Sequence, residues 1–115
     1  MADCIFCKIA QKEILSKLVY EDDTVVAFRD LEPQAPQHVL VIPKKHVESL
    51  LALEEDDKAL VSHILVDVIP QLAQELGIAE KGVRVVANTG EDAGQTVKHL
   101  HFHLLGGSSM QWPPG

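Results

Sequence analysis

The segment from His99 to Leu105 constrains the fold most, because histidine occupies alternate positions in it. Side chains alternate between the two faces of a β-strand, so His99, His101 and His103 would share one face, with successive Cβ atoms roughly 6.6 Å apart. The opposite face would consist of the apolar residues Leu100, Phe102 and Leu104. A helix would scatter the three imidazoles around its axis. We therefore expect a strand with one packed face and one face available for chemistry.

The length and composition are typical of one globular domain over residues 1–115, with an extended tail over residues 106–115. The apolar share of 46% suits an ordinary packed core. No apolar run approaches the ~20 residues of a membrane span, and the first residues show no signal-peptide pattern, so we expect a cytoplasmic protein. The formal net charge of −7 argues against broad binding to nucleic acid or to anionic membranes.

Four further segments have strand patterns bounded by turn residues. They are Leu18–Tyr20, Thr24–Arg29, His38–Ile42 and Val83–Asn88. The first two surround the tight turn at residues 21–23 and predict an antiparallel hairpin. The third is almost entirely apolar and ends at Pro43, which predicts a central position in the sheet.

Two helices complete the expected architecture. Apolar residues follow helical spacing from Glu54 to Leu76, acidic residues open this segment, and Gly77 suits the position after its C-terminus. Pro70 should kink this long helix near its middle. A short N-terminal helix is predicted over Asp3–Ile9, with Asp3 as its N-cap. The expected fold is α+β, with a five-stranded antiparallel sheet, one long helix and one short N-terminal helix.

Three aligned imidazoles permit more than one function. Two of them could bind one metal ion, a neutral imidazole could attack phosphorus, or the histidines could simply be core residues. A turn containing Gly90 and Gly94 precedes the triad, and its main-chain N–H groups could receive phosphate oxygens. Cys4 and Cys7 are equally ambiguous among a redox pair, half of a metal site and two buried thiols.

The run from Gly94 to Leu104 resembles the signature of the histidine triad (HIT) superfamily, in which histidine alternates with apolar residues. It is most similar to the Hint branch, the histidine triad nucleotide-binding proteins. Other segments share the resemblance, namely Phe28–Leu31, Pro33–Pro36, Leu40–His46, Asn88 and Trp112–Gly115. The resemblance implies a HIT-like fold, a purine nucleotide ligand and a homodimer whose C-terminal tail reaches the partner's site.

The resemblance also implies catalytic roles. His101 would attack the α-phosphorus of a purine nucleoside 5′-phosphoramidate, such as adenosine phosphoramidate or a lysine adduct of AMP, or of an aminoacyl adenylate. Water would then hydrolyse the nucleotidyl-histidine. His99 and His103 would flank the nucleophile, and His38 would extend the chain of histidines. Thr96 replaces a serine found in many family members and keeps the hydroxyl group.

The implied nucleotide site draws on several segments. Its residues would be Phe6, Phe28, Asp30, Leu31, Asn88, Gly94, Gln95, Thr96, His101, His103 and, from the tail, Trp112. Residues 94–96 and Asn88 would hold the α-phosphate. Asp30 would accept hydrogen bonds from the ribose, and Phe6, Phe28 and Leu31 would form an apolar slot for the purine.

Zinc-bearing relatives use a cysteine pair together with histidines at the positions of His46 and His99. This chain has all four residues, Cys4, Cys7, His46 and His99, so the resemblance implies a structural zinc ion with no role in the chemistry. Two rival functions remain open. One is a zinc-stabilised nucleotide-binding or scaffold module with little turnover. The other is hydrolysis of dinucleoside polyphosphates, which the Hint-type tail disfavours.

Overall fold

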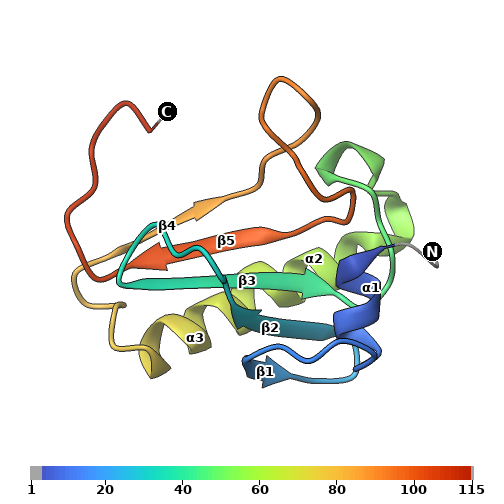
Figure 1. Ribbon diagram of the computed structural model, residues 1–115, viewed down its shortest axis with the longest axis horizontal. Helices are drawn as coiled ribbons and strands as arrows, with labels where there is room; N and C mark the ends of the chain where they lie inside the picture. Colours follow the sequence, from blue (N-terminus) through green and yellow to red (C-terminus); the bar gives the residue numbers. More distant parts are fainter. Residues whose placement is uncertain (1–3, 115) are drawn as a thin grey trace.

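Short apolar segments form five strands, which pair antiparallel in the order β1-β2-β3-β5-β4 (Figure 1). The computed structural model describes residues 4–114 of the chain. The strands are β1 (Leu18–Glu21), β2 (Val25–Arg29), β3 (Gln37–Pro43), β4 (Val83–Val86) and β5 (Phe102–Gly106). The α+β prediction is confirmed, and β3 has the predicted central position.

Both faces of the sheet are covered, because alternate residues of β3 pack into two separate clusters. Val39 and Val41 are fully buried in the cluster that contains the long helix. Leu40 and Ile42 pack in a second cluster with the short helix α1 (Ile5–Ala10). A strand covered on both faces explains why its sequence is a continuous apolar run.

The long helix is continuous in sequence but changes type along its length. It consists of the 3₁₀ turn η2 (Glu55–Asp57), α2 (Lys58–Ser62), the π-helical segment η3 (His63–Val68) and α3 (Ile69–Glu75). A capping box between Glu54 and Asp57 begins it, and Gly77 follows with a φ of 74°. The kink expected at Pro70 remains a prediction; the helix has a π-helical segment that ends at Val68, two residues before Pro70.

Two shorter elements and several boundaries complete the description. A separate 3₁₀ turn, η1 (Leu50–Ala52), lies between β3 and the long helix. Asp3, the predicted N-cap of α1, lies outside the described residues, and the Cys4 side chain caps this helix by accepting from the Cys7 N–H at 3.4 Å. Strand β4 ends at Val86, so Asn88 lies in the following loop. Among the described helices, none has the length and apolar character that crossing a membrane requires.

The prediction of a strand beginning at His99 is wrong at its N-terminal end. The chain bends at residues 97–99, and β5 begins only at Phe102. The Leu100 N–H donates to the Val47 carbonyl at 2.6 Å, so the backbone here bonds to the segment after β3. His99 and His101 are 0% and 6% exposed, and they do not lie on an open sheet face. The alternate apolar residues Leu100, Phe102 and Leu104 do pack in the cluster with the long helix, as predicted.

His63 links the long helix to the turn between β1 and β2. Its Nε2 lies 2.7 Å from an Asp22 carboxylate oxygen, and its Nδ1 lies 2.8 Å from Asp67. Carboxylates only accept, so both ring nitrogens donate and the ring is an imidazolium. The bonds to Asp22 and Asp67 raise the pKa of His63 above its ordinary value of 6.5.

We expect His63→Gln to lower the thermal unfolding midpoint at about pH 5.5 and to have little effect at about pH 9. Because the pKa of His63 is raised in the folded protein, the stabilisation is complete below the unfolded pKa and is lost as pH rises through the folded pKa. Calorimetry of the variant and the parent across this range measures the difference. Asp67→Asn, which keeps the bond to Asp22, should show a smaller loss at acid pH. A loss of equal size at both pH values would contradict the assignment.

Candidate active site

His101 lies immediately before β5, where the bend at residues 97–99 has turned the chain. Its Nδ1 lies 2.7 Å from the carbonyl oxygen of His99. A carbonyl oxygen only accepts, so Nδ1 carries the ring proton and Nε2 of the neutral ring keeps a lone pair. Phe6 of α1 packs edge-on against this imidazole, with ring centroids 5.1 Å apart. The arrangement presents an oriented nucleophilic nitrogen.

His38 and His103 form a hydrogen-bonded pair across the central strands β3 and β5. His38 Nε2 lies 2.9 Å from His103 Nδ1, and an Asp30 carboxylate oxygen lies 3.4 Å from the same Nε2. Burial lowers the pKa of His38 and lowers that of His103 to about 4, although Asp30 opposes both shifts. Both rings are therefore neutral near pH 7. The rings of His101 and His103 are neighbours, with centroids 5.1 Å apart.

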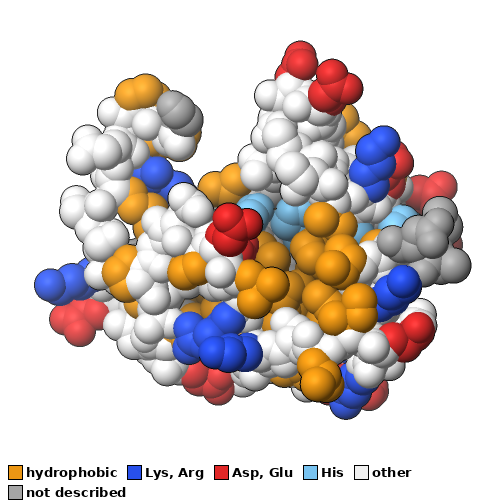
Figure 2. Space-filling model, in the orientation of Figure 1, with side chains coloured by type: hydrophobic (Ala, Val, Ile, Leu, Met, Phe, Trp, Pro, Cys, Tyr) orange, Lys and Arg blue, Asp and Glu red, His pale blue; other side chains and the backbone are white. Residues whose placement is uncertain are grey.

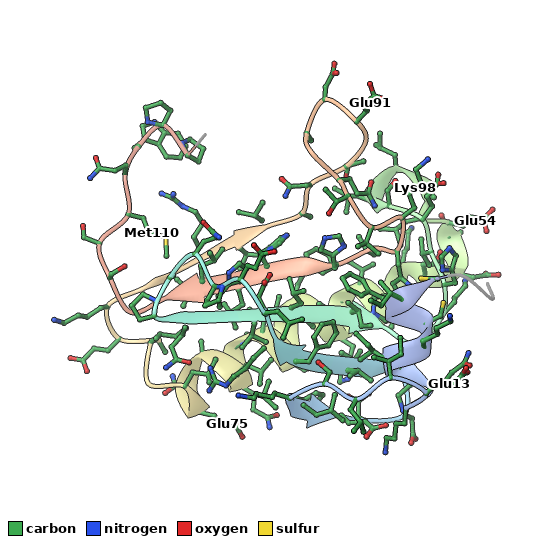
Figure 3. All side chains as sticks on the ribbon, viewed as in Figure 1. Glu13, Glu54, Glu75, Glu91, Lys98 and Met110 are labelled. Carbon is green, nitrogen blue, oxygen red and sulfur yellow. The ribbon has the colours of Figure 1, made fainter. Side chains whose placement is uncertain are left out.

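The histidines lie in a hollow beneath a projecting loop. Figure 2 shows histidine atoms between this loop and an apolar area of the surface, and Figure 3 labels Glu91 at the tip of the loop. Gly90 and Gly94 shape the loop, with φ values of 85° and 77° that favour glycine. The glycine-containing turn thus projects beside the histidine hollow, and the groove that it lines is completed by Glu48, Ser49 and Leu51.

Gln95 holds this loop in place through its side-chain amide. Its Oε1 accepts from the Gly90 N–H at 2.9 Å, and its Nε2 donates to the carbonyls of Glu48 at 2.7 Å and Val97 at 3.1 Å. The backbone N–H of Gln95 also donates within the loop, to Gly90. The amide therefore connects three backbone segments, and its hydrogen-bonding groups are engaged by the protein itself.

Thr96 is the residue of the turn whose polar groups face outward. It is exposed, and within residues 4–114 its N–H and hydroxyl have no hydrogen-bond partner. It lines a groove of about 620 Å³ together with Gly94 and Lys98. Asn88 is half-buried in the same loop after β4. Of the residues predicted to hold phosphate, Thr96 thus offers the most accessible donors.

The aromatic residues predicted for the purine slot are largely buried. Phe6 and Phe28 meet edge-on at 5.5 Å and pack in the cluster beneath the histidines. Leu31 is 92% exposed beside half-buried Asp30. Trp112 is 80% exposed in the tail and is not brought to the histidine cluster of its own chain. The structure therefore brings Phe6 into contact with His101, whereas the tail that carries Trp112 is bonded to Arg84 through the Gln111 carbonyl.

A second cluster, of metal-ligand type, includes His99, which lies two residues before His101. One ligand atom from each of Cys4, Cys7, His46 and His99 lies within 4.8 Å of the others. The His99 Nδ1 lies 3.3 Å from Cys4 Sγ and 3.5 Å from Cys7 Sγ, and His46 Nδ1 lies 3.2 Å from Cys7 Sγ. Two thiols and two imidazoles form a donor set suited to a tetrahedral metal ion.

The protonation of this cluster also suits a metal. His99 Nε2 donates to the Pro43 carbonyl at 2.8 Å, which leaves the lone pair of Nδ1 facing the thiols. Burial lowers the pKa of His99 to about 4, so the ring is neutral, as a ligand must be. Burial and the neighbouring Cys4 raise the pKa of Cys7. A metal ion bound here would have to displace that proton, because the thiolate is the form that ligates.

Sequence reasoning missed three groups that organise the site. The Pro43 carbonyl and the Gln34 N–H, which donates to His38 at 3.0 Å, are backbone atoms. The third is the side-chain amide of Gln95, which we assigned to phosphate rather than to the loop. The signal for Gln34 in the sequence is its position in the segment Pro33–Pro36, which contributes to the family resemblance.

Comparison with known proteins supports a family assignment. The family model described as the HIT domain matches residues 11–110. An uncharacterised HIT-like protein of Synechococcus elongatus is 54% identical over 113 residues, which cover 98% of this chain and 97% of the relative. A HIT family hydrolase from Legionella pneumophila has 50% identity and a TM-score of 0.95, with 98% of this chain and 100% of that chain covered. A histidine triad protein from Clostridium difficile has 53% identity and a TM-score of 0.92, with 96% of each chain covered.

Proposed function

The chain belongs to the HIT domain family, and on this premise we propose that it hydrolyses the phosphorus–nitrogen bond of purine nucleoside 5′-phosphoramidates. The observation that carries the proposal is the hydrogen bond from His101 Nδ1 to the His99 carbonyl, which leaves a lone pair on Nε2. The ring of His101 lies beside that of His103, with centroids 5.1 Å apart, and Thr96 of the preceding turn has an N–H and a hydroxyl without partners among the described residues. Such a constellation suits nucleophilic attack at a phosphate ester or amide.

The proposed reaction has two steps. His101 Nε2 forms a bond to the α-phosphorus, and the bond from phosphorus to the leaving amine breaks as that amine takes up a proton from the solvent. Water then attacks the phosphorus of the nucleotidyl-histidine, the bond to Nε2 breaks, and one proton is released. The His99 carbonyl stabilises the positive imidazolium that exists between the two steps, because it accepts from Nδ1–H throughout.

We assign the surrounding residues to binding. The N–H and hydroxyl of Thr96 would donate to phosphoryl oxygens, and Gln95 would hold the loop that carries them. Asp30 would accept from the ribose hydroxyls, and exposed Leu31 would contact the purine above the buried layer of Phe6 and Phe28. His103 would complete the donors around phosphorus.

The His101→Ala variant should lose activity on adenosine phosphoramidate by a factor on the order of 10³ or more, because it lacks the nucleophile. Release of AMP by the purified full chain is the measurement, and acid quenching of the parent should trap one adenylyl group on His101, visible by mass spectrometry. His63→Gln, a histidine outside the hollow, serves as the matched control and should keep full activity.

Equal AMP release by the parent and His101→Ala would remove the nucleophile assignment. No release by the parent, with retained AMP binding, would favour a nucleotide-binding module. Faster cleavage of diadenosine polyphosphates than of the phosphoramidate would favour a dinucleoside polyphosphate hydrolase. His101→Gly with added imidazole separates a folding defect from a chemical one, because imidazole can restore only the chemistry.

We propose that zinc occupies the cluster of Cys4, Cys7, His46 and His99 and has a structural role. Four protein ligands would complete its coordination and leave no position for substrate. Bound there, the ion would hold α1 against the bend at His99. Unoxidised thiols suit a reducing compartment, which is consistent with the cytoplasmic location expected from the sequence.

Protein purified without chelators should contain about one equivalent of zinc by elemental analysis. Cys7→Ser should reduce this below a tenth and lower the unfolding midpoint by roughly 10 °C, because metal binding contributes to folding. His63→Gln should retain the metal and is the control for loss through handling. A parent protein with less than a tenth of an equivalent would count against zinc.

We also propose that two copies pair along the β4 edge and exchange their tails. Within the described sheet, β4 pairs on only one side. Val83 and Val85 are each 40% exposed on it, so the long helix leaves this edge uncovered. Arg84 of the same strand donates to the Gln111 carbonyl at 3.0 Å, which directs the tail with Trp112 away from its own histidines. Apolar residues on an open edge suit pairing with a second copy.

Sedimentation should give twice the chain mass of 12.6 kDa. Val85→Lys should shift the protein to monomer at micromolar concentration, whereas Val66→Lys, on an exposed face of the helix, should not. Trp112→Ala should leave the dimer intact and weaken substrate binding. A monomeric parent protein would overturn the pairing.

A further inference from the structure

The hydrogen-bond partners of His38 determine which of its two ring nitrogens carries the proton. Its Nδ1 lies 3.0 Å from the backbone N–H of Gln34, and a peptide N–H can only donate. The Nδ1 atom therefore carries no proton. A neutral imidazole has one ring proton, which must then be on Nε2.

The groups around Nε2 support the same tautomer. The Asp30 carboxylate oxygen lies 3.4 Å from Nε2, where a lone pair would be repelled and an N–H is favoured. His38 is buried, and burial lowers its pKa, so the neutral form predominates near pH 7. Two independent neighbours thus assign one proton position.

The assignment passes from His38 to His103 through their hydrogen bond. Since His38 Nε2 carries a proton, it donates to His103 Nδ1 at 2.9 Å. The ring proton of neutral His103 must then be on its Nε2. In His101 the ring proton is on the other nitrogen, Nδ1, because Nδ1 donates to the His99 carbonyl. Two neighbouring imidazoles therefore present opposite groups, a lone pair from His101 and an N–H from His103.

The loop before β3 aims the Gln34 N–H. Glu32 N–H donates to an Asp30 carboxylate oxygen at 2.8 Å, and the Gln34 side-chain amide donates to the Glu32 carbonyl at 2.9 Å. The Asp30 N–H donates to the His38 carbonyl at 3.0 Å, which closes the loop. The two bonds made by Asp30 thus hold the backbone that carries this N–H, and the Gln34 side chain adds one contact within the same loop.

We propose that Gln34 is a positioning residue whose backbone N–H sets the tautomers of His38 and His103, so that His103 offers an N–H donor to a phosphoryl oxygen. The catalytic part of this proposal rests on the proposed function. A neutral imidazole that released its Nε2 proton would become an imidazolate, so His103 keeps the proton and stabilises developing negative charge by donating. The leaving amine therefore takes its proton from the solvent and not from His103.

The tautomers can be read directly from ¹⁵N chemical shifts and two-bond couplings of the histidine rings in the full-length protein. We expect His103 protonated on Nε2 and His101 protonated on Nδ1 near pH 7. Gln34→Pro removes the N–H and should give His103 a mixture of tautomers. Gln34→Ala keeps the N–H and loses only the side-chain bond to Glu32, so its tautomers should be unchanged and it is the matched control.

The kinetic consequence should follow the tautomers. Gln34→Pro should lower kcat on adenosine phosphoramidate by about tenfold and leave KM within about twofold, since the lost donor acts on developing charge. Gln34→Ala should stay within about twofold in both constants. If the proline variant does not fold, replacement of the Gln34 amide by an ester removes the same hydrogen with little change in shape.

A parent protein with His103 protonated on Nδ1 overturns the proposal, as does a folded Gln34→Pro or ester variant with unchanged tautomers. A parent with the expected tautomers but no phosphoramidate turnover overturns the proposed function, while the tautomer assignment stands on the spectra. The two failures are therefore distinguishable.

Discussion

The burial of His99 is the constraint on which the rest of the site depends. The residue has no exposed surface, and each of its polar groups has a different task. Its Nε2 donates to Pro43 at the end of β3, its Nδ1 faces the thiols of Cys4 and Cys7, and its carbonyl accepts from His101. One residue thus joins the sheet and the metal-type cluster through its side chain and the nucleophile through its carbonyl.

The strands and the long helix could be predicted because their patterns are local. Alternating or continuous apolar residues form strands, and the spacing of the helix survives the change to π geometry around Pro70. The bend before β5 could not be predicted in this way. It depends on bonds from Leu100 to the Val47 carbonyl and from His99 to the Pro43 carbonyl, and these partners lie about fifty residues earlier. Periodicity contains no information about such partners.

Some parts of the candidate site could be predicted from the sequence and others could not. Alternate histidines after a glycine-containing turn suggested nucleophilic chemistry, although metal binding fitted the spacing equally well. The grouping of Cys7 with His46 and His99 joins residues 39 and 92 positions apart, and only the family resemblance suggested it. The Gln34 N–H was invisible, because every residue except proline has one and only the fold decides where it points.

The three-way hydrogen bonding of Gln95 has a consequence for protein engineering. Its amide accepts once and donates twice to the backbone, a combination that neither a carboxylate nor an ammonium group can supply. The loop is therefore anchored at one residue, whereas its tip at residues 91–93 is exposed. A designer who wishes to change the groove that this loop lines can lengthen or replace that tip and retain Gln95. The anchor and the variable part of the loop are separable modules.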